Sequence, residues 1–338
     1  MNISALLLAA AIALTGCSSG RVSTEAESSA ASQEQASSQL ESFSQDENPA
    51  PAPTPSPAPP VPEPEESESS EESSEESSTP REPIKLEDVP GISDEFVLSR
   101  MDRPMEEIRA LDPTQVVWGP GANTDGKQPA EPLANQQKWG RLGAWFVAPA
   151  TEKIYLTFDE GYDAGYNEEI LDTLKEKNVS AVFFVTLGFV QSRPDLVQRM
   201  IDEGHVVGNH TWKHIAFPKM DPMDCAKDLL YLHEYVRQNF GGYEMTLCRP
   251  PEGAFGEQSL ALLQSLGYDA VLWSFAYRDW ELDNQPDTGT ALNTIVSRAH
   301  PGAIYLLHAV SSANASVLGE AIDQLQEQGY VFAKWDLS

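Results

Sequence analysis

Apolar runs and helical patterns alternate regularly from Lys153 to the C-terminus, and this alternation limits the folds that the chain can adopt. The first run, 154–158, is rich in β-branched and aromatic residues, which indicates a strand. Apolar residues at helical spacing follow and end near Asn178. Further strands are expected at 181–186, 205–208, 245–248, 270–273, 303–307 and 330–335, and further helices at 194–203, 222–240, 257–267, 290–299 and 313–328. Seven strands, each but the last followed by a helix, predict an α/β fold with a parallel sheet, which closure would turn into a barrel.

Reactive side chains follow the ends of these expected strands. Because the carboxyl ends of parallel strands meet at one edge of a sheet or barrel, we expect these side chains to lie together. One such cluster could be accidental, whereas five on the same side form a pattern. The clusters are Asp159 and Glu160 after the first strand, His210 and His214 after the third, Arg249 after the fourth, Asp279 and Trp280 after the fifth, and His308 at the sixth.

These residue types suit metal-assisted hydrolysis. Two histidines four residues apart, if helical, share one face and can bind one divalent metal ion through neutral imidazole nitrogens. One carboxylate would complete a three-ligand site, and a second would take a proton from water. His308 can serve as the acid, and Arg249 would keep the base ionised. Each motif alone is weak, because such histidine pairs are often structural and acidic residues often cap a helix after a strand.

The N-terminal part of the chain predicts an exported protein. Residues 1–16 contain an apolar run that is too short to cross a bilayer and fits a secretory signal peptide. The box 14–17 resembles the lipobox of bacterial lipoproteins, which makes Cys17 a lipidation site and places the protein at the outer face of the cell membrane. An ordinary signal peptide with an incidental cysteine is the alternative. Residues 17–90, rich in Ser, Glu and Pro, predict a disordered tether.

Charge and cysteine content narrow the possible partners. The formal net charge of -30 leaves no basic footprint for phosphates, so a nucleic-acid partner is not expected. Three cysteines are too few for a disulfide-built scaffold, although Cys225 and Cys248 could pair in an exported protein. His233 is expected on a solvated helix face. We expect a monomer in which an extension, 91–150, packs on a catalytic domain, 151–338.

The ordered motifs resemble those of a known family, the polysaccharide deacetylases, also called the NodB-homology or carbohydrate esterase family 4 enzymes. Within that family the chain is most similar to the PdaA-type, delta-lactam-biosynthetic de-N-acetylases associated with sporulation. The resemblance implies a distorted parallel β/α barrel with seven strands. It rests on Thr157-Phe158-Asp159-Glu160-Gly161, His210-Thr211-Trp212-Lys213-His214, Arg249-Pro250-Pro251-Glu252-Gly253, Asp279-Trp280 and Ile304-Tyr305-Leu306-Leu307-His308.

The resemblance also implies a role for each matching residue. The implied assignments are Asp159 as the catalytic base, His210, His214 and Glu160 as metal ligands, Arg249 as the residue that orients the base, Asp279 as the partner of the catalytic acid His308, and Trp280, Leu306 and Pro251 as substrate-binding residues. Two positions depart from the family pattern. Glu160 stands where an Asp is common, and Ala276 replaces the first Asp of D-x-x-D-W. Because the Glu side chain is one methylene longer, either the loop before Gly161 shifts so that Glu160 reaches the metal, or Glu160 points away and water fills the third position.

The expected function is therefore a metal-dependent hydrolase that removes acetyl groups from N-acetylated cell-wall glycan. Zinc is the favoured cofactor, with cobalt or manganese as alternatives, and N-acetylmuramic acid of peptidoglycan is the favoured target. Deacetylation of N-acetylglucosamine in peptidoglycan or chitin-like chains is the alternative within the enzyme class. The departures at Glu160 and Ala276 leave open a catalytically inactive, glycan-binding lipoprotein.

Overall fold

The computed structural model describes residues 91–121, 123 and 125–337 of the 338-residue chain. The expected signal peptide 1–16, the lipidation site Cys17 and the tether 17–90 lie outside the described residues. Within the described part of the chain, no helix combines the length and the apolar character that crossing a membrane requires.

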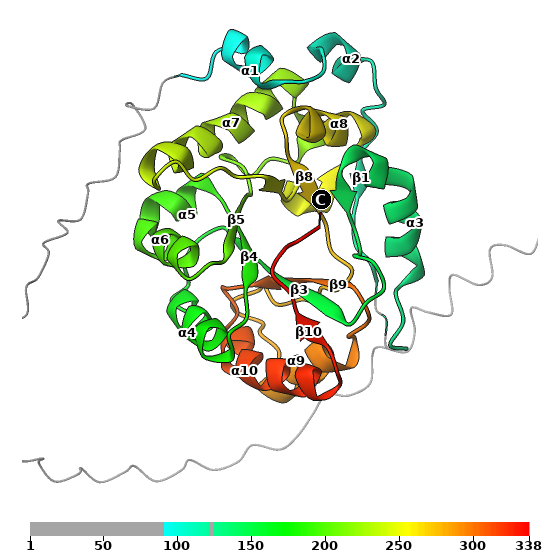
Figure 1. Ribbon diagram of the computed structural model, residues 1–338, viewed down its shortest axis with the longest axis vertical. Coiled ribbons are helices and arrows are strands. Elements are labelled where there is room, and N and C mark those ends of the chain that lie inside the picture. Colours follow the sequence, from blue (N-terminus) through cyan, green and yellow to red (C-terminus); the bar gives the residue numbers. More distant parts are fainter. Residues whose placement is uncertain (1–90, 122, 124, 338) are drawn as a thin grey trace, which may run out of the picture. The chain divides into compact units, whose positions relative to one another are not determined.

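Helices and strands alternate along most of the described chain (Figure 1). The helices are α1 Asp94–Arg100, α2 Met105–Arg109, α3 Ala130–Trp139, α4 Asn167–Lys177, α5 Leu187–Ser192, α6 Pro194–Asp202, α7 Pro222–Asn239, α8 Glu257–Ser265, α9 Thr288–Ser297 and α10 Ser312–Glu327, with 3-10 turns η2 Gly140–Leu142, η3 Phe217–Lys219 and η4 Pro251–Gly253. The strands are β1 Val116–Val117, β2 Ala144–Trp145, β3 Lys153–Glu160, β4 Ala181–Val185, β5 Val206–Asn209, β6 Leu247–Cys248, β7 Ala254–Phe255, β8 Asp269–Val271, β9 Ala303–His308 and β10 Val331–Phe332.

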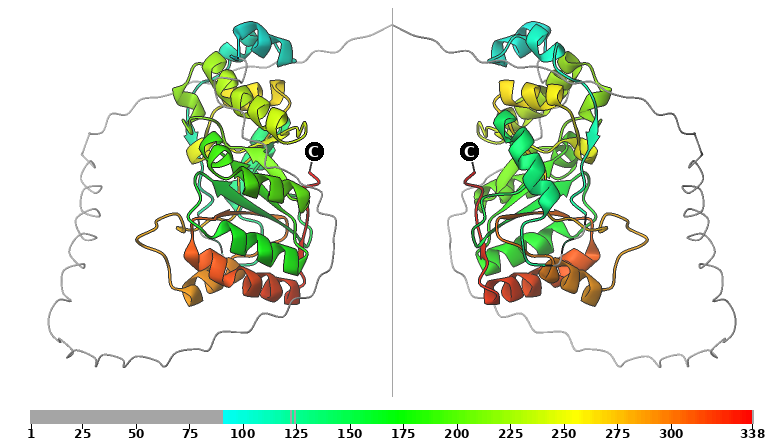
Figure 2. Two further views of the ribbon diagram at one scale, coloured as in Figure 1. Left: turned by 90° about the vertical axis from the view of Figure 1, so that its left-hand side faces the viewer. Right: turned by 90° about the vertical axis from the view of Figure 1, so that its right-hand side faces the viewer.

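The main sheet is parallel and curled, which confirms the predicted fold class. Its strand order is β10-β3-β4-β5-β6-β8-β2, and β9 pairs with β3. An isolated parallel bridge between Phe275 and Tyr305 joins the segment after β8 to β9, so the two ends of the central sheet meet. Helices cover the outside of this curled sheet (Figures 1 and 2).

Local sequence accounts for the central elements. All five side chains of β4 are buried, as expected for a parallel strand that is covered on both faces. Helix α4 buries Ile170, Leu171 and Leu174 on one side and ends at Asn178, whose φ of 53° is left-handed. The predicted end of this helix is therefore confirmed, and asparagine is among the residues that tolerate this conformation.

The last strand is shorter than the sequence predicts. A strand was expected over 330–335, but only Val331 and Phe332 pair, with Lys153 and Ile154 at the start of β3. From Leu156 onward β4 pairs with β3. Because β9 pairs with the other edge of β3, no free edge remains along which β10 could continue.

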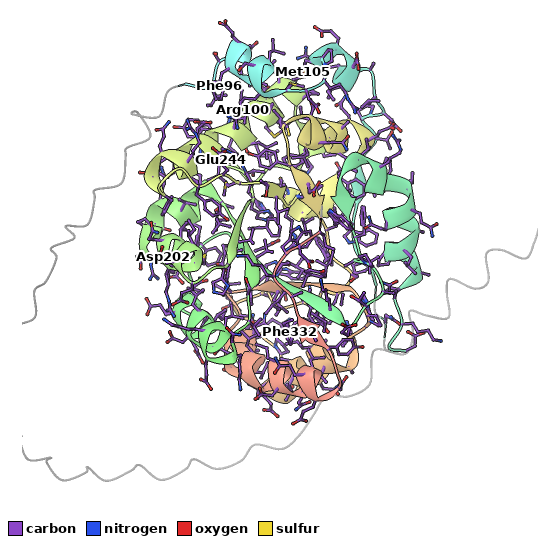
Figure 3. The ribbon with its side chains drawn as sticks, viewed as in Figure 1. Phe96, Arg100, Met105, Asp202, Glu244 and Phe332 are labelled. Atoms are coloured by element: carbon purple, nitrogen blue, oxygen red, sulfur yellow. The ribbon has the colours of Figure 1, made fainter. Side chains whose placement is uncertain are left out.

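The segment 91–150 packs against the domain that follows it. Strand β2 adds to the main sheet beside β8, and β1 pairs with β7 in a separate antiparallel ribbon. Helices α1 and α2 lie over α7 and α8 at one end of the molecule (Figure 2). Met105, labelled in Figure 3, is buried, and Phe96 packs against the core. Strands as short as β1 and β2 show too little alternation of apolar and polar residues to be predicted from the sequence. The division between an extension, 91–150, and a catalytic domain, 151–338, remains a prediction.

Candidate active site

Asp159, near the carboxyl end of β3, pairs with a buried arginine. Nη1 of Arg249 lies 2.7 Å from Oδ1 of Asp159, and the Arg249 side chain is fully buried. Burial alone would raise the pKa of Asp159, but the charges of Arg249, His210 and His308 and the Arg249 hydrogen bond outweigh it and lower the pKa. Asp159 is therefore an ionised carboxylate that can accept a proton near neutral pH.

Arg249 is fixed on all sides, so it positions the carboxylate rigidly. Its Nε donates to the carbonyl of Val271 (2.9 Å), and its Nη2 donates to Oγ1 of Thr157 (2.7 Å). The guanidinium also lies 4.3 Å from the centroid of the Phe184 ring, a cation–π contact. Thr157 and Asp159 are two residues apart on β3 and so point to the same face of the strand. The expected role of Arg249 agrees with this geometry.

The two imidazoles of the second motif converge. Nε2 of His210 lies 3.2 Å from Nε2 of His214 and 3.6 Å from Oδ2 of Asp159. Nδ1 of His210 lies 2.9 Å from the carbonyl oxygen of Arg249, which can only accept a hydrogen bond, so the proton sits on Nδ1 and Nε2 keeps its lone pair. Burial lowers the pKa of His210 to about 4. A neutral imidazole aimed at its neighbour in this way suits a shared divalent cation.

The backbone between the two histidines is not the helix that their spacing suggested. Residues 210–214 form a loop after β5, and Thr211 and His214 have left-handed φ values of 72° and 52°. Helical spacing therefore does not bring the imidazoles together. A reversal of the backbone between them does, and side-chain hydrogen bonds to the loop stabilise it.

Glu160 does not join the two histidines. Neighbouring residues of a strand point to opposite faces, and Glu160 is fully buried, with Oε2 accepting a hydrogen bond from Nδ2 of Asn167 (3.2 Å). Burial raises the pKa of Glu160 well above its usual range. Among residues 91–121, 123 and 125–337, no three His, Cys, Asp or Glu side chains are placed to hold one metal ion. The expected three-ligand site that includes Glu160 is thus not formed by these side chains.

His308 and Asp279 form a second charged pair beside Asp159. Register places His308 on β9 directly next to Asp159 on β3, which puts the two backbones about 4.8 Å apart. Nδ1 of His308 lies 2.7 Å from Oδ1 of the fully buried Asp279. Burial lowers the pKa of His308, but the charge and hydrogen bond of Asp279 and the charge of Asp159 outweigh it and raise the pKa. His308 is thereby kept as a proton donor.

The expected substrate-binding residues differ in exposure. Trp280 is 49% exposed, and its ring centroid lies 5.6 Å from that of His308. Leu306 is buried and pairs in register with Thr157, whereas Pro251 is buried in η4. Of the three, Trp280 offers the largest surface to a ligand that reaches His308.

Sequence reasoning missed a residue that completes this pair. Asn314, at the start of α10, is buried and donates from Nδ2 to Oδ2 of Asp279 (2.7 Å). Its Oδ1 accepts a hydrogen bond from the hydroxyl of Tyr277. An asparagine 35 positions from its partner belongs to no short motif, so no sequence signal singles it out.

Two of the sequence-based interpretations concern residues away from this site. His233, expected on a solvated face, is buried between the Tyr268 hydroxyl (2.6 Å) and Oε2 of Glu244 (2.7 Å), so that expectation is wrong. Helix α7 is buried around much of its circumference, so a polar residue on it can be shielded from solvent. Cys225 and Cys248 are both buried free thiols, so a disulfide between them is not formed.

Comparisons with protein families, with known sequences and with solved structures all point to the same family. Residues 147–271 match the family described as polysaccharide deacetylase. The chain is 42% identical over 197 residues to the peptidoglycan-N-acetylmuramic acid deacetylase PdaA of Bacillus subtilis, and this match covers 58% of this chain and 75% of that protein. An uncharacterized 30.6 kDa protein of Geobacillus stearothermophilus is 40% identical over 220 residues, which cover 65% of this chain and 83% of the relative.

Solved structures agree with the sequence matches. The structure of Bacillus subtilis PdaA, a family 4 carbohydrate esterase, superposes with a TM-score of 0.64 at 36% identity, covering 66% of this chain and 96% of that one. The chain belongs to the polysaccharide deacetylase family. The prediction of a hydrolase that acts on non-peptide carbon–nitrogen bonds is therefore confirmed.

Proposed function

We propose that this enzyme removes the acetyl group from N-acetylmuramic acid of peptidoglycan. The observation that carries the proposal is the convergence, at the carboxyl ends of β3, β5 and β9, of a proton acceptor, an imidazole pair and a proton donor. The 42% identity to PdaA, which is named as a peptidoglycan-N-acetylmuramic acid deacetylase, supports the choice of sugar.

The enzyme is proposed to use a divalent metal ion. The two Nε2 atoms of His210 and His214 would hold it, and their 3.2 Å separation with a fixed tautomer on His210 fits such an ion. A bound zinc, cobalt or manganese ion would polarise the acetamide carbonyl and lower the pKa of water. Zinc is favoured because imidazole nitrogens are common zinc ligands and because catalytic zinc ions are held by few protein ligands.

The protein's own groups supply the proton transfers. Asp159, ionised and fixed by Arg249, accepts a proton from the attacking water. His308, held by Asp279, donates a proton to the sugar nitrogen as the carbon–nitrogen bond breaks. Because Asp159 and His308 are neighbours on adjacent strands, acceptor and donor flank one reacting centre.

A second sugar is a specific alternative. The chain is 33% identical over 189 residues to the peptidoglycan-N-acetylglucosamine deacetylase PgdA of Listeria monocytogenes, although these residues cover only 39% of that protein. The two candidates differ in one group, since muramic acid carries a lactyl carboxylate. Glycan freed of its peptide stems exposes that carboxylate, which can cyclise onto the amine that deacetylation liberates.

Export, lipid anchoring and a monomeric state are proposed as well. The apolar run of 1–16 and the box that ends at Cys17 support anchoring at the outer face of the membrane, and the composition of 17–90 supports a spacer between membrane and catalytic domain. Peptidoglycan lies on that side of the membrane, so this location gives access to the proposed substrate. Resemblance to sporulation-type deacetylases supports a role in the spore wall.

Mass spectrometry of muropeptides tests the proposed substrate. Peptidoglycan stripped of peptide stems should lose acetate and then form muramic lactam when treated with the metal-loaded enzyme, whereas chitin oligomers should react slowly. Faster turnover of chitin oligomers would overturn the muramic-acid assignment in favour of N-acetylglucosamine. Release of acetate from neither substrate at any metal concentration would favour a glycan-binding protein.

A further inference from the structure

Side-chain oxygens hold the backbone of the loop that carries the two histidines. Its backbone adopts left-handed φ values at Thr211 and His214, a conformation that non-glycine residues rarely adopt. Every N–H group from 211 to 214 nevertheless has a side-chain oxygen as its partner. The bonds run from Thr211 to Oδ1 of Asn209 (2.8 Å), from Trp212 and Lys213 to Oδ2 of Asp228 (2.9 and 3.4 Å), and from His214 to Oγ1 of Thr211 (2.9 Å).

Asp228 is the one acceptor among these that lies far from the loop in sequence. It lies on α7, is only 3% exposed, and uses a single oxygen, Oδ2, for both N–H groups. Its other oxygen, Oδ1, is buried without a hydrogen-bond partner. Burying a carboxyl group costs free energy unless hydrogen bonds replace its contacts with water. For Asp228, the N–H groups of Trp212 and Lys213 supply such hydrogen bonds, so its burial is linked to the loop.

The same helix also anchors the residue at the start of the loop. Asn209 donates from Nδ2 to the carbonyl of Leu229, the residue next to Asp228 on α7 (2.9 Å), and its Oδ1 holds the N–H of Thr211. Helix α7 buries most of one side against the core and so provides a rigid support. The N–H groups of residues 211–213 are thus tied, directly or through Asn209, to consecutive residues of one helix.

We propose that Asp228 is a positioning residue for the metal site, which fixes the 211–214 loop so that the imidazoles of His210 and His214 converge before the metal binds. The proposal rests on the proposed function, because it assumes that this histidine pair binds the ion. Without the two hydrogen bonds to Oδ2, the left-handed backbone would relax toward ordinary φ values and the two Nε2 atoms would separate. Groups that orient metal ligands from outside the coordination sphere typically change metal affinity by about 10- to 100-fold.

Cobalt titration of the full-length, metal-free protein tests this proposal. Binding is followed by the visible absorption of Co²⁺ and by competition with a chelator, so no catalytic assay is needed. Asp228→Ala should weaken Co²⁺ binding by about 10- to 100-fold. Asp228→Asn should bind within about threefold of wild type, because its amide oxygen can accept the same two N–H groups.

A matched control separates positioning from general destabilisation. Glu234 is another buried carboxyl group on α7, but its hydrogen bonds go to Arg237 and it has none to the loop. Glu234→Ala should lower the melting temperature and leave Co²⁺ affinity unchanged. Unchanged affinity in Asp228→Ala would overturn the proposal, as would equal loss in the Ala and Asn variants. Wild-type protein that binds no Co²⁺ would instead refute the proposed metal site itself.

A measurement on the wild-type protein covers the case in which Asp228→Ala fails to fold. Hydrogen exchange of the metal-free protein should show protected amides at Trp212 and Lys213, since both N–H groups are bound before any ion arrives. Fast exchange at both amides, with protection only after Co²⁺ addition, would mean that the metal orders the loop and that Asp228 does not preorganise it.

Discussion

Replacing Asp279 by asparagine should move the basic limb of the pH–rate profile toward lower pH. Burial lowers the pKa of His308, and the charge and hydrogen bond of Asp279, whose Oδ1 lies 2.7 Å from Nδ1 of His308, are the main effects that outweigh it. Asparagine has the same shape but no charge. In the variant, burial acts without opposition from Asp279, so the pKa of His308 falls and the imidazolium is lost at a lower pH.

The size of this change follows from the geometry. An opposite charge at this range changes a pKa by about 1–3 units, and each unit corresponds to about 1.4 kcal/mol. On the alkaline side of the profile, kcat/KM at fixed pH should therefore fall about tenfold for each pH unit by which the basic limb moves. The acidic limb, which we assign to Asp159, should move much less, because Arg249 dominates the charge around that carboxylate.

The assay is kcat/KM for deacetylation, measured across the neutral and alkaline range for wild type and Asp279→Asn. Asp269→Asn is the matched control, because Asp269 is also a shielded carboxyl group but lies at the start of β8, where it contacts Trp145 rather than the site. The control should leave both limbs in place. An Asp279→Asn profile that loses rate uniformly without moving its basic limb would refute the assignment of His308 as the proton donor.

Other substitutions test the remaining assignments. Asp159→Asn should lower the rate at least ~100-fold. It should also lower the melting temperature, because it leaves the buried Arg249 without its charged partner. Retained activity in the folded variant would show that another group is the base. The pKa of Glu160 is raised in the folded state, so the stability that its protonated carboxyl group contributes is lost as pH rises through the folded-state pKa. Glu160→Gln cannot ionise, so in urea unfolding it should be more stable than wild type at alkaline pH, and its Co²⁺ affinity should equal that of wild type. Weaker Co²⁺ binding in this variant would show that Glu160 is a metal ligand. Cys17→Ala should release the protein from membranes and abolish palmitate labelling, whereas a soluble, unlabelled wild type would contradict the lipid anchor.

Much of the central sheet could be predicted because its signals are local. Apolar runs such as 181–185 are long enough to be recognised as buried strands, and the helical spacing of α4 is regular up to Asn178. The extension was harder, because β1 and β2 are two residues each and form only by pairing with strands that are distant in sequence. These short strands are stabilised by hydrogen bonds to their partner strands, and such bonds leave no periodic pattern in the sequence of the strand itself.

The order of strands and helices along the chain predicts which reactive residues share one edge of the sheet. Parallel strands end on the same side, so the positions of Asp159 and His308 at the ends of two expected strands placed both at one edge of the sheet. The direct pairing of β3 with β9, which makes the two residues neighbours, appears only in the folded structure. Three further features could not be predicted: Glu160 turns inward to Asn167, Asn314 supports Asp279, and the histidine loop reverses instead of forming a helix. These outcomes depend on contacts between side chains far apart in the chain, whose geometry is fixed only when the helices pack on the sheet.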